Sequence, residues 1–424
     1  MLAALREWLL AQQLTLFLGI VGYFWANWMF KLLLAQFYRP IRQGYGKAVS
    51  VIMPVYNEDR EVLRQSLSLL LARPAWEVAE LIVITDRREP DLIPWLKANL
   101  PTDARLRLAT GQFSGKRFSL RLGIELARSE VVVSVESDVL VRPDAICELI
   151  KPFDRADVGG VVGDQQVYEP LRTMWTFFDF LCEKVKYSIG YPAFSLWRQV
   201  PVLAGRTVAY RRAAVLPLLD GLTHETFLGR RCISGDDGRI TSLLLESGWR
   251  TLYQATAVVE TISPDSPKAL FMQRTRWYRN TCRRTLRALF WDRLWVWRSY
   301  PLVTWGMIAA WLNPLLVGVL LFLLGHSLWS GHFWWFGPDA GGVTLRIALL
   351  LLGLTLTRSL RAWPGYRALA AHRPGWRWFL VLLLPFYLVF LWLIRLYAIA
   401  TFNRQGWVTR QTMAAGGVNA RFKS

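Results

Sequence analysis

Between residues 44 and 298, short apolar runs alternate with stretches of helical periodicity. The runs are rich in Val, Ile and Leu, and their length of four or five residues predicts buried strands. The predicted strands are 49–53, 81–84, 105–109 and 131–135, and the predicted helices are 59–72 and 118–127. Strands that alternate with helices favour a parallel, doubly wound α/β sheet, which binds its ligands beyond the carboxyl ends of the strands.

Outside this region the chain contains apolar stretches near the length of about 20 residues that a bilayer-spanning helix needs. They are residues 14–34, 301–324, 343–356 and 378–400. A signal peptide is the competing interpretation of the first stretch, but no short apolar core with a small-x-small cleavage site is present. Arg39, Arg42 and Lys47 follow that stretch, so the positive-inside rule predicts that the middle region is cytoplasmic.

The last apolar stretch differs from the others because Pro385 interrupts it and Arg395 lies within it. Residues 325–342 contain no Lys or Arg and are expected outside, whereas residues 358–377 carry five arginines and are expected inside. Proline breaks a helix, and irregular backbone at membrane depth needs protein or a water-filled cavity beside it. We therefore expect residues 378–400 to form two short or kinked helices that enter the membrane and return, leaving the tail cytoplasmic.

Composition supports a chain that is partly solvated by lipid. Of 424 residues, 53% are hydrophobic and 19% are charged, against about 25% charged in soluble domains. This excludes a disordered chain, a collagen-like fibre and a disulfide-stapled mini-protein. The formal net charge is +20, and residues 268–424 contain 20 Lys and Arg but two acids. A basic C-terminal half of this kind is typical of proteins that bind nucleic acid or a membrane surface. Because this half is also strongly apolar, we expect it to contact membrane lipids and not nucleic acid.

The four cysteines form no CxxC pair, and the chain has only four histidines. A zinc site is therefore not expected. We expect the four cysteines to be reduced thiols in a cytoplasmic environment.

Acidic residues recur where predicted strands or turns end. Asp86 and Asp138 follow strands, and Asp236 and Asp237 lie in a Gly-Asp-Asp-Gly turn. Side chains alternate along a strand, so Glu136 and Asp138 point to the same side, and carboxylates suit Mg²⁺ on a diphosphate. Taken alone, residues 136–138 are more often a solvated strand exit that caps a helix, and the Gly-Asp-Asp-Gly segment could be an ordinary turn.

Two basic segments are candidates for anion binding. Residues 115–117 (Gly-Lys-Arg) open a predicted helix, where backbone amides favour an anion. Residues 273–277 (Gln-Arg-Thr-Arg-Trp) combine arginine, suited to phosphate, with tryptophan, suited to a sugar face. The alternative for this second segment is an interfacial amphipathic helix, because Trp291, Trp295 and Trp297 follow it. Residues 168–189 are likewise predicted to form an amphipathic interfacial helix.

The ordered set of motifs resembles a membrane-integrated family-2 glycosyltransferase, such as the hyaluronan and chitin synthases and the alginate polymerase subunit. The motifs are PVYNE (54–58), Asp86, GKR (115–117), ESD (136–138), VGGVVGD (158–164), AGRTVAYRR (204–212), GDD (235–237), QRTRW (273–277) and a WVTR segment (407–410). The resemblance implies a GT-A type, Rossmann-like α/β domain that is cytoplasmic and flanked by transmembrane and interfacial helices. The implied division is a transmembrane helix (1–43), the glycosyltransferase domain (44–270), QxxRW and interfacial helices (271–300), channel helices (301–400) and a cytoplasmic tail (401–424).

The resemblance also implies roles for individual residues. A nucleotide-sugar, a UDP-sugar in preference to a GDP-sugar, would be bound by Pro54, Tyr56, Glu58, Asp86, Lys116, Ser137, Asp138 and Arg276. Asp138, with Glu136 as a weaker candidate because the usual residue there is Asp, would hold Mg²⁺ or Mn²⁺. Asp237, beside Asp236, would be the general base. The acceptor would contact Gly205, Arg206, Gln273 and Trp277, and a gating loop would contain Trp407, Thr409 and Arg410, with Val408 in place of the usual Gly.

The implied function is an inverting, metal-dependent polysaccharide synthase that secretes its product through its own helices in the inner (plasma) membrane. The alternative is a single transfer to a membrane lipid, and a third hypothesis is a non-enzymatic basic membrane protein.

Overall fold

A computed structural model describes residues 8, 12–111, 115–290, 299–330 and 343–404. Its centre is an eight-stranded sheet of order β3-β2-β1-β4-β7-β6-β10-β5. The strands are β1 (Val49–Val55), β2 (Val78–Asp86), β3 (Leu106–Gly111), β4 (Val131–Val135), β5 (Val139–Val141), β6 (Val158–Val167), β7 (Thr207–Arg211) and β10 (Arg250–Thr261). A separate two-stranded hairpin joins β8 (Thr226–Phe227) to β9 (Arg230–Arg231).

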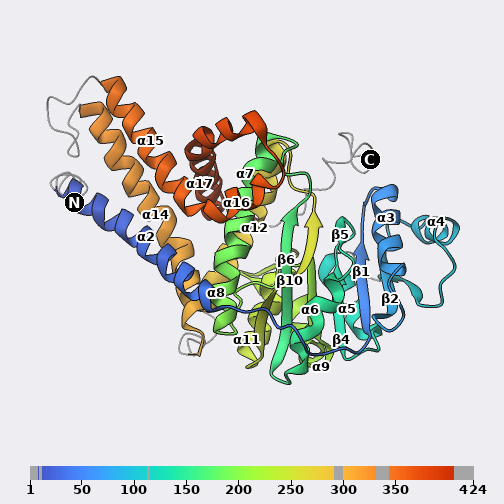
Figure 1. Ribbon diagram of the computed structural model, residues 1–424. Coiled ribbons are helices and arrows are strands. Elements are labelled where there is room, and N and C mark those ends of the chain that lie inside the picture. Colours follow the sequence, from blue (N-terminus) through green and yellow to red (C-terminus); the bar gives the residue numbers. More distant parts are fainter. Residues whose placement is uncertain (1–7, 9–11, 112–114, 291–298, 331–342, 405–424) are drawn as a thin grey trace.

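Helices cover both faces of the sheet and bury its apolar side chains (Figure 1). One face packs against α3 (Arg60–Leu71), α4 (Leu92–Asn99) and α6 (Ala145–Ile150). The other face packs against α5 (Lys116–Leu126), α9 (Arg212–Val215), α10 (Leu219–Thr223) and α11 (Asp236–Glu246). Short 3₁₀ segments at Lys151–Asp154 (η1) and Leu216–Leu218 (η3) connect these elements.

The predicted local elements are confirmed. The runs at 49–53, 81–84, 105–109 and 131–135 fall in β1 to β4, and the two predicted helices are α3 and α5. Helix α3 begins where expected because the Asp59 carboxylate accepts hydrogen bonds from the backbone N–H groups of Glu61 and Val62.

The expectation of a parallel sheet holds for most strand pairs and is wrong for two strands. Strand β7 runs antiparallel between β4 and β6, and β5 runs antiparallel to β10. The remaining neighbours, β1 with β2 and β4, β2 with β3, and β6 with β10, are parallel. The pairing of Val135 with Thr207 places the residues just before β7 beside those just after β4. The mixed sheet thereby brings two distant motifs to one edge.

Residues 168–189 were expected to form an interfacial helix, and this expectation is wrong in one respect. Helix α7 (Met174–Val185) continues through a π-turn, η2 (Lys186–Gly190), into α8 (Tyr191–Leu196). Phe177 and Phe178 on α7 are fully buried among α16 (Trp363–Ala370) and α17 (Leu384–Ala400). The aromatic face of α7 therefore packs against other helices of the protein and not against the membrane interface.

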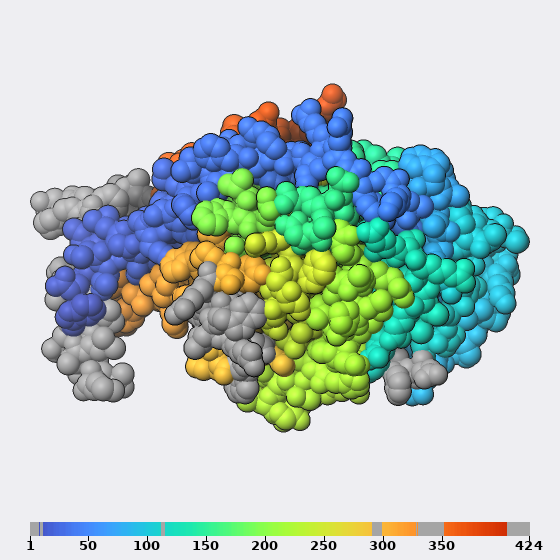
Figure 2. Space-filling view, turned by 90° about the horizontal axis from the view of Figure 1, so that it is seen from below, coloured from blue at the N-terminus to red at the C-terminus, as the bar shows by residue number. Residues whose placement is uncertain are grey.

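Three helical segments of the described residues are long and apolar enough to cross a membrane: Gln13–Phe37 (α2), Pro301–Ser327 within α14 (Pro301–Ser330), and Gly375–Ala400. The remaining predicted stretch, residues 343–356, lies in α15 (Val343–Arg361). Helices α2, α14 and α15 extend together away from the sheet, and α2 lies along α14 in both views (Figures 1 and 2). Large apolar side chains such as Leu18 and Leu33 are exposed on α2, as lipid-facing positions would be.

The last predicted stretch is interrupted as its proline predicts. Residues Gly375–Leu383 (η4) form a 3₁₀ helix, and α17 begins at Leu384 with Pro385 in its first turn. Proline fits there because a first-turn N–H has no partner within the helix. Whether this segment enters the membrane and returns stays a prediction.

A test of the sheet uses the close approach of β6 and β10. A Cβ atom added at Gly163 would lie 2.3 Å from the carbonyl oxygen of Ala257, so Gly163→Ala should displace one strand. We expect a loss of about 1–3 kcal/mol in the free energy of unfolding. The control is Gly190→Ala, where nothing lies within 4 Å of the added atom. Thermal unfolding in detergent should show a lower midpoint for Gly163→Ala than for the control, and equal midpoints would contradict the predicted strand packing.

Candidate active site

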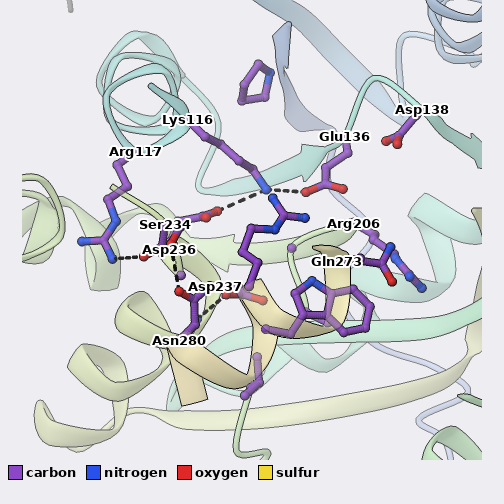
Figure 3. A pocket seen from close by; sticks show the side chains of 18 of the residues that line it. Lys116, Arg117, Glu136, Asp138, Arg206, Ser234, Asp236, Asp237, Gln273 and Asn280 are labelled. Atoms are coloured by element: carbon purple, nitrogen blue, oxygen red, sulfur yellow. Dashed lines mark hydrogen bonds and ion pairs between the residues drawn. The ribbon is translucent and has the colours of Figure 1, made fainter. Parts of the chain in front are cut away.

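One cavity of about 570 Å³ lies at the carboxyl ends of β1, β2 and β4 and extends to α11 and α12 (Pro267–Phe290). It collects nearly every site residue predicted among the described residues (Figure 3). The predicted residues that line it are Pro54, Tyr56, Glu58, Asp86, Lys116, Glu136, Asp138, Gly205, Arg206, Asp236, Asp237, Gln273, Arg276 and Trp277. Motifs more than 200 residues apart in sequence therefore share one site.

The β1 and β2 ends form an aromatic and acidic corner. The guanidinium of Arg88 lies over the ring of Tyr56, 3.9 Å from its centroid, and donates to both carboxylate oxygens of Asp86 at 2.8 and 2.9 Å. Asp86 is buried, and this pair fixes its orientation. Tyr56, predicted from the PVYNE motif, thus sits against a fixed ion pair.

Ser137 is the one described candidate that does not line the cavity. It is 1% exposed, and its hydroxyl donates to Glu58 at 2.7 Å. Its contact with the cavity is therefore indirect, through the orientation of Glu58.

The ammonium of Lys116 joins two acidic motifs. It forms ion pairs with Glu136 and, at 3.2 Å, with Asp236 (Figure 3). Burial by itself would lower the pKa of Lys116, but the carboxylates of Asp236 and Glu136 outweigh it and raise that pKa above the ordinary lysine value. Lys116 therefore stays charged at neutral pH and neutralises part of the acidic cluster.

Antiparallel pairing of β4 and β7 places the 204–206 loop against this cluster. The backbone N–H of Glu136 donates to the carbonyl of Arg206 at 2.9 Å. A Cβ at Gly205 would lie 3.2 Å from Lys116 Nζ and 3.6 Å from Asp237 Cβ. The absence of a side chain at Gly205 thus leaves room beside the acids.

Asp236 and Asp237 begin helix α11, where the partial positive charge of a helix N-terminus stabilises carboxylates. Gly235 precedes them with φ of 81°, a left-handed conformation that favours glycine. Burial and then repulsion from Asp236 raise the pKa of Asp237 above the ordinary aspartate value, while Lys116, the Gly238 N–H and Arg284 offset part of that rise. Asp237 is only partly buried, so its carboxylate is accessible from the cavity.

Helix α12 forms the opposite wall with Gln273, Arg276 and Trp277. The guanidinium of Arg206, from the loop before β7, lies 5.5 Å from the centroid of the Trp277 ring. Since these side chains line the cavity, the interpretation of this segment as a plain interfacial helix is not favoured.

The acidic side chains fit a metal ion only together with a ligand. Among the described residues, no three His, Cys, Asp or Glu side chains are placed to share a metal. Mg²⁺ in such sites typically takes one or two carboxylates and completes its shell with phosphate oxygens and water. Asp138 offers a carboxylate to the cavity, whereas Glu136 is paired with Lys116. The residues therefore fit a metal held jointly by Asp138 and a diphosphate.

The sequence analysis missed several cavity residues. Lys186 and Arg284 line the cavity and come from segments without a recognised motif. Arg88 does not line it but contacts Tyr56 and Asp86, which do, and it was missed as well. Arg88 follows Asp86 by two residues, and Arg284 follows Trp277 by about two helical turns. The spacing on α12 was the only available signal, since residues seven apart share a helix face. Trp407, Thr409 and Arg410 lie outside the described residues.

Comparison with known proteins identifies the domain. A family model for glycosyltransferase-like family 2 matches residues 46–280, more than half of the chain. The chain belongs to this glycosyltransferase family. The match covers every motif from PVYNE to QRTRW, and the expectation of a glycosyltransferase domain is confirmed.

Relatives of this family-2 chain include an N-acetylglucosaminyltransferase from Azorhizobium caulinodans, 28% identical over 57% of this chain and 61% of that protein. A hyaluronan synthase from Streptococcus pyogenes is 27% identical over 63% of this chain and 65% of that protein. The chain thus spans under two thirds of the length of these relatives. Among solved structures, the mannosyltransferase PcManGT from Pyrobaculum calidifontis, in complex with GDP-Man and Mn²⁺, superposes with a TM-score of 0.60 over 87% of this chain and 99% of that one, at 18% identity. This likeness confirms the predicted GT-A type fold.

Proposed function

We propose that this family-2 protein is an inverting polysaccharide synthase that transfers a sugar from a nucleotide-sugar to a growing glycan. The observation that carries the proposal is the single cavity in which Asp138, Asp237, Arg276 and Trp277 meet. Carboxylates for a metal and a base, a cation for phosphate and an aromatic ring for a sugar are the groups that such a transfer needs.

In the proposed reaction, Asp237 accepts the proton of the acceptor hydroxyl as its oxygen attacks the anomeric carbon. The nucleoside diphosphate leaves from the opposite face, so the configuration inverts. Arg276 stabilises the charge that develops on the leaving diphosphate. A Mg²⁺ or Mn²⁺ ion, held by Asp138 with the diphosphate, would neutralise further charge there.

Two polar atoms of the cavity wall support a polar ligand near Trp277. Arg206 Nη1 and Gln273 Oε1 are buried and have no hydrogen-bond partner in the described part of the chain. Buried polar atoms are normally hydrogen-bonded. The hydroxyl groups of an acceptor sugar would supply the missing partners.

The proposal places the protein in the inner (plasma) membrane with its catalytic domain in the cytoplasm. The three apolar helices support the membrane location, and the polysaccharide would pass outward beside them. The proposed donor is a UDP-sugar in preference to a GDP-sugar, as the resemblance of the motifs implies. A single transfer to a lipid is the alternative outcome.

The test is incubation of the purified protein with UDP-N-acetylglucosamine, UDP-glucuronic acid, UDP-glucose or GDP-mannose and Mg²⁺ or Mn²⁺. Release of nucleoside diphosphate together with a long product is expected. One sugar attached to one lipid would contradict the synthase and support single transfer. No release with any donor would contradict both forms of the proposal.

Replacement of the proposed base should separate catalysis from donor binding. Asp237→Asn keeps the size of the side chain but removes its ability to accept a proton, so we expect a loss of roughly 10²–10⁴-fold in transfer rate. The affinity for the donor that the wild type uses in the assay above, measured by calorimetric titration, should change little. A variant that loses donor binding, or that keeps its rate, would contradict the role as base.

The environment of Asp237 predicts a shift in pH dependence. A base acts in its ionised form, so activity should rise with pH through the raised pKa of Asp237. Asp236→Asn removes a repelling charge, so the acidic limb of the kcat/KM profile should move to lower pH. The control is Asp220→Asn on the surface, where the carboxylate is 79% exposed. An acidic limb that stays in place or moves to higher pH would contradict the predicted coupling.

A further inference from the structure

A group of buried charges lies behind the wall of the cavity, between α7 and α12. Asp179 and Glu183, one helical turn apart on α7, are 0% and 3% exposed. Arg274 on α12 is 7% exposed and forms ion pairs with both carboxylates. None of these three side chains lines the cavity.

The three charged groups are paired with one another, since an unpaired buried charge would destabilise the folded protein. Arg274 Nη1 lies 3.3 Å from Glu183 Oε1, and its Nη2 donates to Asp179. Lys186 Nζ lies 2.8 Å from the other carboxylate oxygen of Glu183. Burial by itself would raise the pKa of Glu183, but Lys186 and Arg274 outweigh it and hold that pKa well below the ordinary glutamate value. The carboxylate is thus ionised at neutral pH, and the arrangement fixes the plane of the Arg274 guanidinium.

That guanidinium in turn lies against the indole of Trp277. Arg274 Cζ is 4.4 Å from the ring centroid, closer than Arg206 Cζ at 5.5 Å. A desolvated contact between a guanidinium and an indole contributes up to about 2 kcal/mol. The two carboxylates of α7 therefore hold a cation that lies against the Trp277 ring.

We propose that Arg274 is a positioning residue for acceptor binding, which holds the Trp277 ring in the orientation that receives the acceptor sugar. The inference rests on the proposed function, because it deepens the role of Trp277 in that site. Arg274 does not touch the substrate. It acts through the ring, and Asp179 and Glu183 act through Arg274.

A purely structural role is the alternative, in which the ion pairs join α7 to α12 and the ring finds its own position. Arg274→Lys distinguishes the two. Lysine keeps the positive charge near Asp179 and Glu183, but it lacks the planar fork that contacts two carboxylates and an indole together.

The first measurement is a cryo-electron microscopy structure of full-length Arg274→Lys in lipid nanodiscs, without substrate. We expect α7 and α12 to remain paired and the Trp277 ring to leave its wild-type position. A ring that stays in place would overturn the proposal. This result does not depend on any activity, so it is separable from failure of the proposed function.

The second measurement is a double-mutant cycle with the donor that the wild type uses and hyaluronan or chitin oligosaccharides as acceptors. Arg274→Lys should raise the acceptor KM roughly 10-fold, the equivalent of a lost contact of about 1.4 kcal/mol, and leave the donor KM within about two-fold. In a Trp277→Ala background the same substitution should change the acceptor KM by less than about two-fold. Equal effects in both backgrounds would show a structural role and overturn the proposal.

Arg211→Lys is the matched control. Arg211 is also buried, lies 5.6 Å from the ring centroid of Phe153 and pairs with Glu130, but it does not line the cavity. It should lower the thermal midpoint and leave the acceptor KM within about two-fold. An acceptor KM that rises as much as in Arg274→Lys would mean that any buried arginine has this effect, and would overturn the specific role.

Discussion

The site depends on the ammonium of Lys116, which lies between Glu136 and Asp236 in a cavity crowded with carboxylates. Like charges repel strongly where water is scarce. Lys116 offsets part of that repulsion and limits the rise in the pKa of Asp237, which shares the cavity with Asp138. Its position follows from the start of α5, and the positions of its partners follow from β4 and α11.

The sheet topology brings these partners together. Strand β7 is inserted antiparallel next to β4, which places Gly205 and Arg206 beside Glu136. On the other side, α12 carries Arg276 and Trp277 to the cavity, and buried charges on α7 hold its Arg274. One wall of the cavity is thus made by the sheet and the loop before β7, and the opposite wall by α12, which packs against α17 (Figure 1).

The sequence predicted what local pattern determines. Strands β1 to β4 and helices α3 and α5 follow from runs of Val, Ile and Leu and from leucine spacing. The direction of β7 could not be predicted, because pairing direction depends on partners distant in sequence. Burial of Phe177 and Phe178 was missed because an apolar helical face packs equally well against protein and lipid. The pairing of Glu136 with Lys116 depends on the relative position of β4 and α5, which no motif records.

The most direct test of the single-site account is a cryo-electron microscopy structure with UDP and Mn²⁺. The account predicts the nucleoside against Tyr56 and Asp86, the metal at Asp138, and the diphosphate pointing toward Arg276. Nucleotide bound elsewhere, or a metal remote from Asp138, would contradict it.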